Sequence, residues 1–369
     1  MLLQERCREL EIRLTEELNR FRPGDKFCTV RDLLARFGAS RRVVDGTLER
    51  MMTAGLLERR TNCGYFVRSR QRKRHAVFFH VDWVSEEQRL LARFFKEEFA
   101  LLNDRYEFGA VAYNYQADPV QLLKECPADF ILICWPSRPI TPSEIAEIAA
   151  CRRQVLIVQR NLVEAGLHCS FRRYEYAATL AVSVLRRNGH RKLALLAAEP
   201  PIGGNRTMAD CFPAIARAER CPVTIIPCDA SAGNYSPDRA HEGLSRHLKE
   251  HGCDFTALFV ISEYAAKGAL SALAEAGLRV PEDVSVIAYG SQESSGTTRP
   301  LLSRIGTSLR QEARELVREI DRRWEQREWG ERIFVVGIPH YRDRGSVRAP
   351  ATHLTDNSND IKPRRNPTS

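Results

Sequence analysis

The sequence contains no long uncharged apolar segment and no closely paired cysteines. No run of about 18 apolar residues without charge occurs, so we expect no membrane-spanning helix. The first residues, MLLQERCRELEIRL, carry charges throughout and lack the apolar stretch of a signal peptide. The 11 cysteines are scattered without a CxxC spacing, which argues against a disulfide framework or a zinc site. Together these absences favour a cytoplasmic protein.

Common catalytic motifs are also missing. There is no GxSxG, and GGNR at 203–206 is not followed by the Gly-Lys-Ser/Thr of a phosphate loop. His247 and His251 lie one helical turn apart, but the intervening segment HLKEH misplaces the glutamate of the HExxH zinc-peptidase pattern. A solvated helix face is the better interpretation of these histidines. The sequence therefore predicts no enzyme, no metal and no cofactor.

The positive charge is concentrated at one end of the chain. Residues 1–74 hold 18 Lys and Arg and 10 Asp and Glu, a net charge of +8, whereas the whole chain carries +9. A compact basic module on a nearly neutral body indicates a polyanionic partner for that module.

The periodicity of residues 1–68 predicts three helices and a hairpin. An apolar stripe from Leu3 to Phe21 indicates a first helix, and Thr29 with Asp32 forms a capping-box pattern for a second. A third helix should begin after Ser40, and LLERR and YFVRS should form the strands of a hairpin. This order is that of a winged helix-turn-helix domain, whose third helix enters the major groove of DNA.

The same segment resembles the GntR-type winged-helix family. PGDKF, TVRDLLARFGASRRVV and AGLLERRTNCGYFV follow the family pattern across residues 10–68. The resemblance implies DNA contacts at Arg31, Ser40 and Arg41 and a wing tip at 62–64, where Asn-Cys-Gly replaces the usual Gly-Arg-Gly-like tip. The DNA-binding candidates are Thr29, Arg31, Ser40, Arg41, Arg42, Asp45, Asn62, Gly64 and Tyr65.

Asp45 and Gly46 depart from a simple DNA-binding helix. Asp45 stands where the family usually has a basic residue, and Gly46 costs roughly 1 kcal/mol of helix propensity relative to Ala. Asp45 either pairs with Arg41 one turn earlier or accepts a hydrogen bond from cytosine N4, with Gly46 allowing a close backbone approach. The intramolecular pair is the favoured interpretation.

Beyond a basic linker at 69–74, the pattern changes to alternating strands and helices. Eight short apolar runs alternate with helical segments such as 86–101, 175–188 and 264–276, which predicts an α/β fold with parallel sheets covered by helices. The length of the region, 75–348, favours two similar lobes. The runs are HAVFFHVDW, YEFGAVAYN, DFILICWP, QVLIVQRN, KLALLAA, PVTIIPCD, TALFVIS and DVSVIAYG.

Residues 75–348 resemble the LacI/GalR family of sugar-responsive regulators. The resemblance rests on RRNGHRKLALLA at 186–197, on the long segment 255–290, and on HYRDRGSVR at 340–348. It implies a two-lobed periplasmic-binding-protein-like domain that forms a homodimer and binds a small effector, usually a sugar, between its lobes.

Ligands of such folds bind beyond the carboxyl ends of the strands. Candidates at the strand ends are Trp83, Asn114, Trp135, Arg160, Ser262, Glu263, Ser291 and Gln292. By the resemblance, Arg173 and Gly290 replace two sugar-binding acids, Glu263 keeps the third, and Arg206 matches a cleft arginine. Loss of two carboxylates and gain of a cation favour an acidic or phosphorylated sugar. The predicted effector-binding residues are Trp83, Trp135, Arg173, Arg206, Glu263 and Ser291.

Both halves together resemble hybrid regulators that join a GntR-type head to a LacI-type effector domain, as in arabinose-responsive repressors. We therefore expect a dimeric repressor that binds a double-stranded DNA operator under control of a carbohydrate-like effector. A ligand-independent DNA-binding protein, with a degenerate sugar domain as its dimerisation scaffold, is the alternative. The tail at 349–369, rich in Asn, Asp, Pro, Ser and Thr, is predicted to be disordered.

Overall fold

The computed structural model divides the chain into two compact units, Met1–Lys73 and Arg74–Ser369. The described residues are 3–18, 20–22, 24–61, 63–68, 73–151, 154–294, 298–326, 329 and 332–350. Most of the linker predicted at 69–74 and of the tail predicted at 349–369 lies outside these residues. Among the helices of the described residues, none has the length and apolar character needed to cross a membrane.

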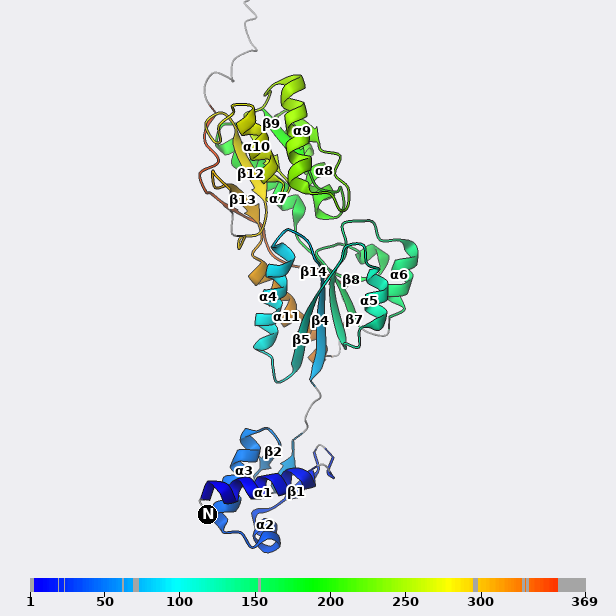
Figure 1. Cartoon of the computed structure of the whole chain (residues 1–369), viewed down its shortest axis with the longest axis vertical. Helices are drawn as coiled ribbons and strands as arrows, with labels where there is room; N and C mark the ends of the chain where they lie inside the picture. The colour runs from blue at the N-terminus through cyan, green and yellow to red at the C-terminus, as the bar shows by residue number, and fades with distance from the viewer. Residues whose placement is uncertain are drawn as a thin grey trace, which may run out of the picture. The chain divides into compact units, whose positions relative to one another are not determined.

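The first unit has the predicted order of helices followed by a hairpin. Its apolar stripe faces inward, because Cys7, Leu10 and Leu14 pack against the third helix, whereas Phe21 falls beyond the first helix and is exposed. The elements are α1 (Leu3–Leu18), β1 (Lys26–Cys28), α2 (Val30–Phe37), α3 (Arg41–Thr53), β2 (Leu57–Arg60) and β3 (Gly64–Val67). The described part of this unit is a helix-turn-helix joined to a two-stranded wing (Figure 1).

An antiparallel sheet completes the first unit in the order β1-β3-β2. Strand β1 was not predicted from the sequence, because three residues are too short to show an alternating pattern. It places Phe27 and Cys28 in the core of the unit. The wing is therefore anchored on one side to the strand that precedes the helix-turn-helix.

The second unit consists of two lobes, each built on a six-stranded sheet. In the first lobe the strands are all parallel, in the order β14-β8-β7-β6-β4-β5. Helices α4 and α11 pack on one face of this sheet, and α5 and α6 pack on the other. The elements are β4 (Arg74–Val81), α4 (Glu87–Ala100), β5 (Tyr106–Tyr113), α5 (Pro119–Glu125), β6 (Phe130–Cys134), α6 (Pro142–Ala149), β7 (Gln154–Val158), β8 (His168–Phe171), α11 (Leu309–Gln326) and β14 (Ile333–Val335).

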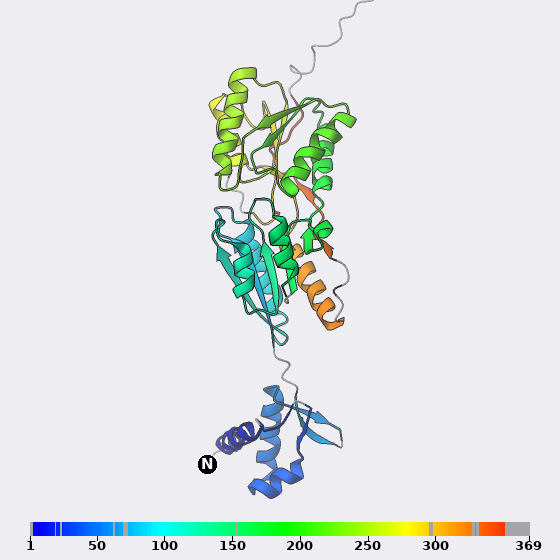
Figure 2. The same ribbon diagram turned by 90° about the vertical axis from the view of Figure 1, so that its right-hand side faces the viewer.

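The second lobe repeats this layered arrangement (Figure 2). Its strand order is β10-β9-β11-β12-β13-β15, with α7 and α8 on one face and α9 and α10 on the other. Only the pairing of β13 with β15 is antiparallel within this described sheet, a departure from the predicted parallel arrangement. The elements are α7 (Tyr174–Arg187), β9 (Leu193–Ala197), α8 (Gly204–Ala218), β10 (Val223–Pro227), α9 (Ser236–His251), β11 (Ala257–Val260), α10 (Ala266–Glu275), β12 (Ser285–Tyr289), β13 (Ser303–Gly306) and β15 (His340–Arg342).

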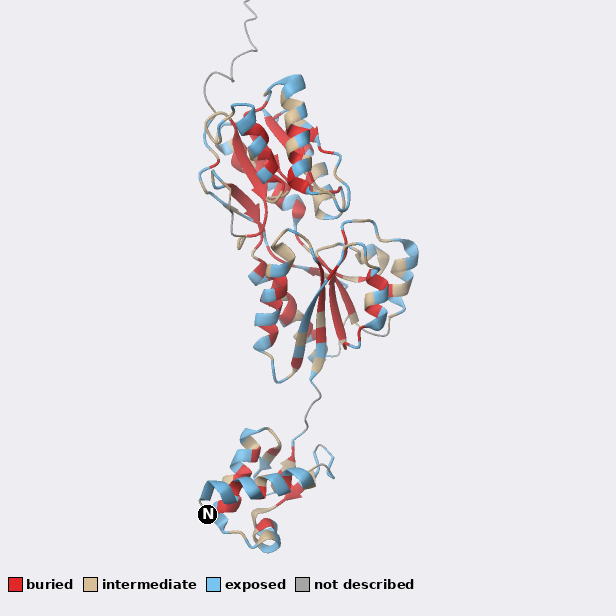
Figure 3. Cartoon of the chain, in the orientation of Figure 1, coloured by how far each residue is buried: buried red, intermediate tan, exposed pale blue. Residues whose placement is uncertain are grey.

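The chain passes between the lobes in short segments. Residues 172–173 connect β8 to α7, residues 307–308 connect β13 to α11, and residues 336–339 connect β14 to β15. The central strands of both sheets are buried almost throughout (Figure 3), which explains why they appear in the sequence as continuous apolar runs. Six of the eight predicted runs correspond to these central strands, and the other two, YEFGAVAYN and PVTIIPCD, contain the more exposed edge strands β5 and β10.

Candidate functional site

The amino end of α2 carries the first of the predicted DNA-binding residues. The Thr29 hydroxyl accepts a hydrogen bond from the Asp32 backbone N–H at 3.2 Å, and the Asp32 carboxylate accepts one from the Thr29 N–H at 2.9 Å. This reciprocal cap confirms the predicted start of α2 and engages the side chain of Thr29 within the protein. Arg31, in the first turn of α2, is exposed.

The amino end of α3 carries the predicted DNA-reading side chains. Ser40 occupies the N-cap position, but its hydroxyl makes no capping bond, so it is available to another partner. Arg41 and Arg42 are exposed in the first turn. Val43, Val44, Thr47, Leu48 and Met51 face the core on the opposite side of the helix.

Asp45 forms the intramolecular ion pair that the sequence favoured. Its Oδ2 lies 3.6 Å from Arg41 Nε, and both side chains remain largely exposed. Gly46 does not belong to the DNA-facing surface, because a Cβ at this position would lie 3.3 Å from the sulfur of Cys7 on α1. The glycine therefore serves the packing of α3 on α1.

The wing supplies fewer binding groups than predicted. Tyr65 is only 7% exposed and packs in the core, so the structure does not place its ring among the exposed candidates. Gly64 has φ +104°, and a Cβ there would come within 2.8 Å of the Cys28 carbonyl oxygen, so its role is in the backbone of the hairpin. Asn62 lies outside the described residues. Arg60 is paired with Glu58 at 2.7 Å and stacks on the ring of Phe66.

In the second unit, a cavity of about 440 Å³ lies at the carboxyl ends of the strands of both sheets. The volume is that of a small-molecule site. Of the strand-end candidates, the wall includes Trp83, Trp135, Arg160, Ser262, Glu263 and Ser291. Asn114 and Gln292 are not part of the wall. The amide of Gln292 instead donates to backbone carbonyls of Gly306 and His340.

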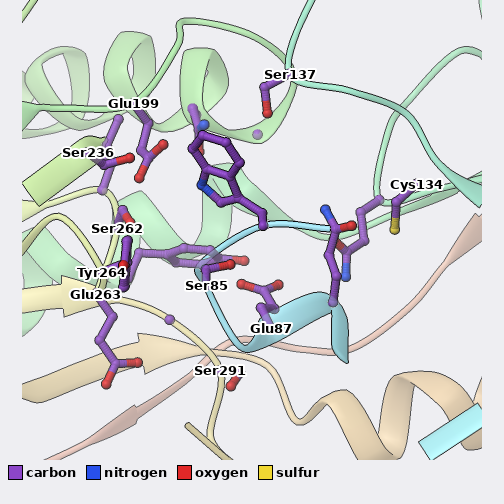
Figure 4. A pocket seen from close by; sticks show the side chains of 18 of the residues that line it. Ser85, Glu87, Cys134, Ser137, Glu199, Ser236, Ser262, Glu263, Tyr264 and Ser291 are labelled. Atoms are coloured by element: carbon purple, nitrogen blue, oxygen red, sulfur yellow. The ribbon is translucent and has the colours of Figure 1, made fainter. Parts of the chain in front are cut away.

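Oxygen-bearing side chains from both lobes face one another across the cavity (Figure 4). Glu87, at the start of α4, and Ser85 belong to the first lobe, whereas Glu199, Glu263 and Ser236 belong to the second. Four carboxylates line the wall in all, namely those of Glu86, Glu87, Glu199 and Glu263. The expectation that the cavity has lost acidic character is therefore wrong.

Glu263 occupies the space left by the glycine at position 290. A Cβ at Gly290 would lie 2.5 Å from Glu263 Oε2, so an acidic side chain at 290 and this placement of Glu263 exclude each other. Burial raises the pKa of Glu263 to about 7. Arg304, which is almost fully buried, approaches the Glu263 carboxylate at 3.3 Å and favours its charged form.

Arg172, rather than the predicted Arg173, reaches the cavity. The Arg172 guanidinium donates to Glu312 Oε2 at 2.8 Å and to Glu87 Oε1 at 2.7 Å. Although burial opposes the charge, these carboxylates raise the pKa of Arg172 above its ordinary value. Arg173 is exposed and absent from the wall, because consecutive side chains at a strand end point to opposite sides.

Arg206 is also outside the cavity. It lies on the exposed side of α8, with 73% of its side chain accessible, and its Nε is 3.6 Å from Asp210 Oδ2. The preceding residue, Asn205, contributes to the wall instead. The acidic or phosphorylated sugar inferred from Arg173 and Arg206 therefore loses both of its supporting residues.

Aromatic rings contribute the apolar part of the wall. Trp135 is buried and follows β6, and Trp83 packs edge-on against Tyr115 with ring centroids 5.5 Å apart. Tyr174 lies against α8 so closely that a Cβ on Gly204 would overlap its ring. The ring centroids of Tyr174 and Tyr289 lie 5.8 Å apart, and the two rings form a second aromatic surface in the wall.

Comparison with known proteins agrees with this architecture. The family described as "Periplasmic binding protein-like domain" matches residues 182–347. The HTH-type transcriptional repressor PurR of Haemophilus influenzae is 35% identical over 129 residues, which cover 35% of this chain and 38% of the relative. The HTH-type transcriptional regulator AscG of Escherichia coli is 27% identical over 212 residues, covering 57% of this chain and 61% of the relative. The chain thus spans about 40% to 60% of the length of these curated relatives.

Solved structures show the same fold. A dimeric Lac repressor with a C-terminal deletion superposes with a TM-score of 0.63 at 20% identity, covering 75% of this chain and 100% of that chain. A LacI transcriptional regulator from a Rhodococcus species gives a TM-score of 0.62 at 20% identity, covering 75% of this chain and 99% of that chain. The second unit of the protein is therefore a two-lobed, periplasmic-binding-protein-like domain with the fold of LacI-type regulators.

Proposed function

We propose that the protein is a transcriptional repressor whose binding to a double-stranded DNA operator is controlled by a small-molecule effector in the cavity. The observation that carries this proposal is the combination of an exposed basic helix end on one unit with a polar cavity in the other. The relatives named repressors support the same role, and the family match at residues 182–347 includes the second-lobe residues of the cavity wall from Glu199 to Ser294.

Operator binding is assigned to the first unit. Arg41 and Arg42, at the amino end of α3, have the placement of groups that reach guanine in the major groove, and Arg31 and Ser40 have the placement of phosphate-binding groups. The protein acts as a homodimer, so that two such units meet a palindromic site. Half-sites then lie roughly 34 Å apart, or a multiple of this distance.

The first unit is assigned to the GntR type of winged helix. The antiparallel sheet β1-β3-β2 and the position of β1 between α1 and α2 support this assignment. A regulator of this kind acts in the cytoplasm, where its DNA is located, and its role requires binding rather than turnover of the effector.

Control by an effector requires that the ligand prefer one arrangement of the lobes. Glu87 and Arg172 link the cavity wall to Glu312 in the first turn of α11, close to the segments that cross between the lobes. A ligand that contacts both lobes changes their separation, and this change is transmitted to the spacing of the DNA-binding units in the dimer. The alternative, a degenerate scaffold that binds no ligand, is disfavoured by the polar cavity that the domain retains.

Selection of DNA sites from a random pool, with and without candidate ligands, tests the proposal. We expect enrichment of a palindromic sequence, and loss of that enrichment in the presence of the effector. Recovery of unrelated sequences with no common motif contradicts operator binding. Enrichment that no ligand alters, together with no thermal stabilisation by sugars, sugar amines, sugar acids or sugar phosphates, favours the ligand-independent alternative.

A further inference from the structure

The positively charged side chains in the cavity wall are engaged by the protein itself. The guanidinium of Arg89 donates to the carbonyl oxygens of Trp83 and Val84, and that of Arg160 donates to those of Pro136 and Arg138. Arg172 is held by Glu312 and Glu87. The ammonium of Lys267 lies over the ring of Tyr264 at 4.8 Å. Each of these four cations therefore already has an oxygen or ring partner within the protein.

Glu199 differs from Glu87 and Glu263, two other carboxylates in the wall, because it has no cationic partner among the described residues. Among the described residues, no Lys, Arg or His side chain forms an ion pair with it, whereas Glu87 pairs with Arg172 and Glu263 pairs with Arg304. Burial raises the pKa of Glu199, and the hydroxyls of Ser262 and Ser236 beside it only partly offset this effect. A half-buried carboxylate of this kind, without a cationic partner, gains from a positive charge brought by a ligand.

The surroundings of Glu199 indicate what else such a ligand carries. Figure 4 shows Glu199, Ser236 and Ser262 on one side of the cavity, with Ser85 and Glu87 from the first lobe also lining it. Hydroxyl and carboxylate oxygens accept hydrogen bonds from ligand hydroxyls. The rings of Trp83 and Tyr264 supply the apolar surfaces that pack against the carbon face of a cyclic molecule.

We propose that Glu199 is a specificity-determining residue that binds a protonated amino group of the effector. A hydroxylated amine, of which an amino sugar is the simplest cyclic example, is then the class of effector that fits this cavity. The inference rests on the proposed function of the cavity as the effector site, and it adds the identity of the recognising group and the charge of the ligand.

The test compares amines with their uncharged and anionic counterparts on the full-length protein. Glucosamine, galactosamine and mannosamine are titrated beside glucose, galactose, mannose, glucuronate and galacturonate, by thermal shift and calorimetry at pH 7. We expect at least one amine to raise the Tm and to bind at least about tenfold more tightly than its neutral parent, because a charged hydrogen bond is formed in a buried site. The uronates should bind no better than the neutral sugars.

Two variants test whether Glu199 is the residue that causes the preference for amines. Glu199→Gln keeps the shape and the neighbouring hydroxyls, so it should reduce the preference for the amine to within about threefold. Its Tm without ligand should not fall, since the substitution removes a half-buried charge that has no cationic partner. Glu164→Gln, at an exposed glutamate of the first lobe outside the cavity wall, should keep the wild-type preference.

The outcomes separate this inference from the proposed function. An amine preference that persists in Glu199→Gln overturns the role of Glu199. Failure of every amine to raise the Tm, or equal binding of an amine and its neutral parent, overturns the amine class. Specific DNA binding measured on the same preparations without ligand tests the proposed function independently, because that binding does not depend on Glu199.

Discussion

Arg41 and Asp45 place opposite charges on one exposed turn of α3. Their separation of 3.6 Å and their high exposure make the pair weak, so each side chain is free to exchange its partner for DNA. We expect Arg41 to gain a guanine or a phosphate and Asp45 to be repelled by phosphates. The two residues should therefore have opposite effects on DNA affinity even though they contact each other in the free protein.

Substitution of Arg41 by Ala should weaken operator binding without changing affinity for the effector. We expect a loss of about 1–3 kcal/mol of binding free energy, which is the usual contribution of an arginine that reads a base. Fluorescence anisotropy with a labelled operator, at physiological salt, measures the change. Unaltered operator affinity would contradict the placement of α3 in the groove.

Asp45→Asn provides the matched comparison on the same helix turn. Removal of the negative charge should increase affinity for operator and for unrelated DNA alike, because the effect is electrostatic and does not depend on sequence. A decrease confined to one base position of the operator would instead support the cytosine contact that the sequence left open.

Glu199 should make the stability of the second unit depend on pH. Its pKa is raised by burial from an ordinary value of 4.5, so the folded protein binds this proton more tightly than the unfolded chain. The resulting contribution is fully present below about pH 4.5 and is lost as the pH rises through the pKa of the folded state. Urea unfolding between pH 4.5 and 8 should therefore show a larger loss of unfolding free energy for the wild type than for Glu199→Gln. If the unfolding free energies of the wild type and Glu199→Gln changed in parallel with pH, Glu199 would not be the source of the pH dependence. The control Glu164→Gln should show the same pH dependence as the wild type.

At the scale of elements, the buried ion pair of Arg172 with Glu312 joins the end of β8 to the start of α11. Arg172→Met should lower the free energy of unfolding by about 3–5 kcal/mol, because it leaves the Glu312 carboxylate buried without its cation. Denaturant titration measures the loss. The double variant Arg172→Met with Glu312→Leu should recover part of it, and a double variant less stable than Arg172→Met alone would argue against a stranded charge.

Strands that are buried on both faces were predicted most directly, and two short strands whose sequences are not apolar runs were missed. LALLA, FILIC and SVIAY are continuous apolar runs and gave β9, β6 and β12 directly. In contrast, HCSF became β8 between its neighbour β7 and the distant β14, and KFC became β1 through pairing with β3. Helix α11 is rich in charge, and nothing local indicates that it returns to cover the first lobe.

Some residues of the candidate site could be placed from the sequence, and others could not. Trp83, Trp135, Glu263 and Ser291 could be placed because the ends of parallel strands converge at one edge of a sheet. Arg172 and Arg173 could not be distinguished, since a shift of one residue reverses the direction of a side chain. Glu199 carried no signal, because its burial and the lack of a cationic partner arise from the fold.

At the scale of the whole molecule, the two units have separate hydrophobic cores. A fragment of residues 74–350 should therefore unfold cooperatively, bind the effector with the affinity of the full chain, and show no affinity for the operator. Circular dichroism, calorimetry and anisotropy measure these three properties. Operator binding by the fragment would contradict the assignment of DNA recognition to the first unit, and failure to fold would show that the units depend on each other.

The return of α11 and β14 to the first lobe has a consequence for synthesis on the ribosome. The core beneath β4 and β6 includes Leu316, Ile320 and Phe334, so this lobe lacks part of its interior until residue 334 has been translated. The first 68 residues, by comparison, contain all the core residues of their own unit. Domains generally fold as units while the chain emerges. A nascent chain therefore completes its DNA-binding unit long before the lobe that is to regulate it, and a prematurely terminated product carries the former without the latter.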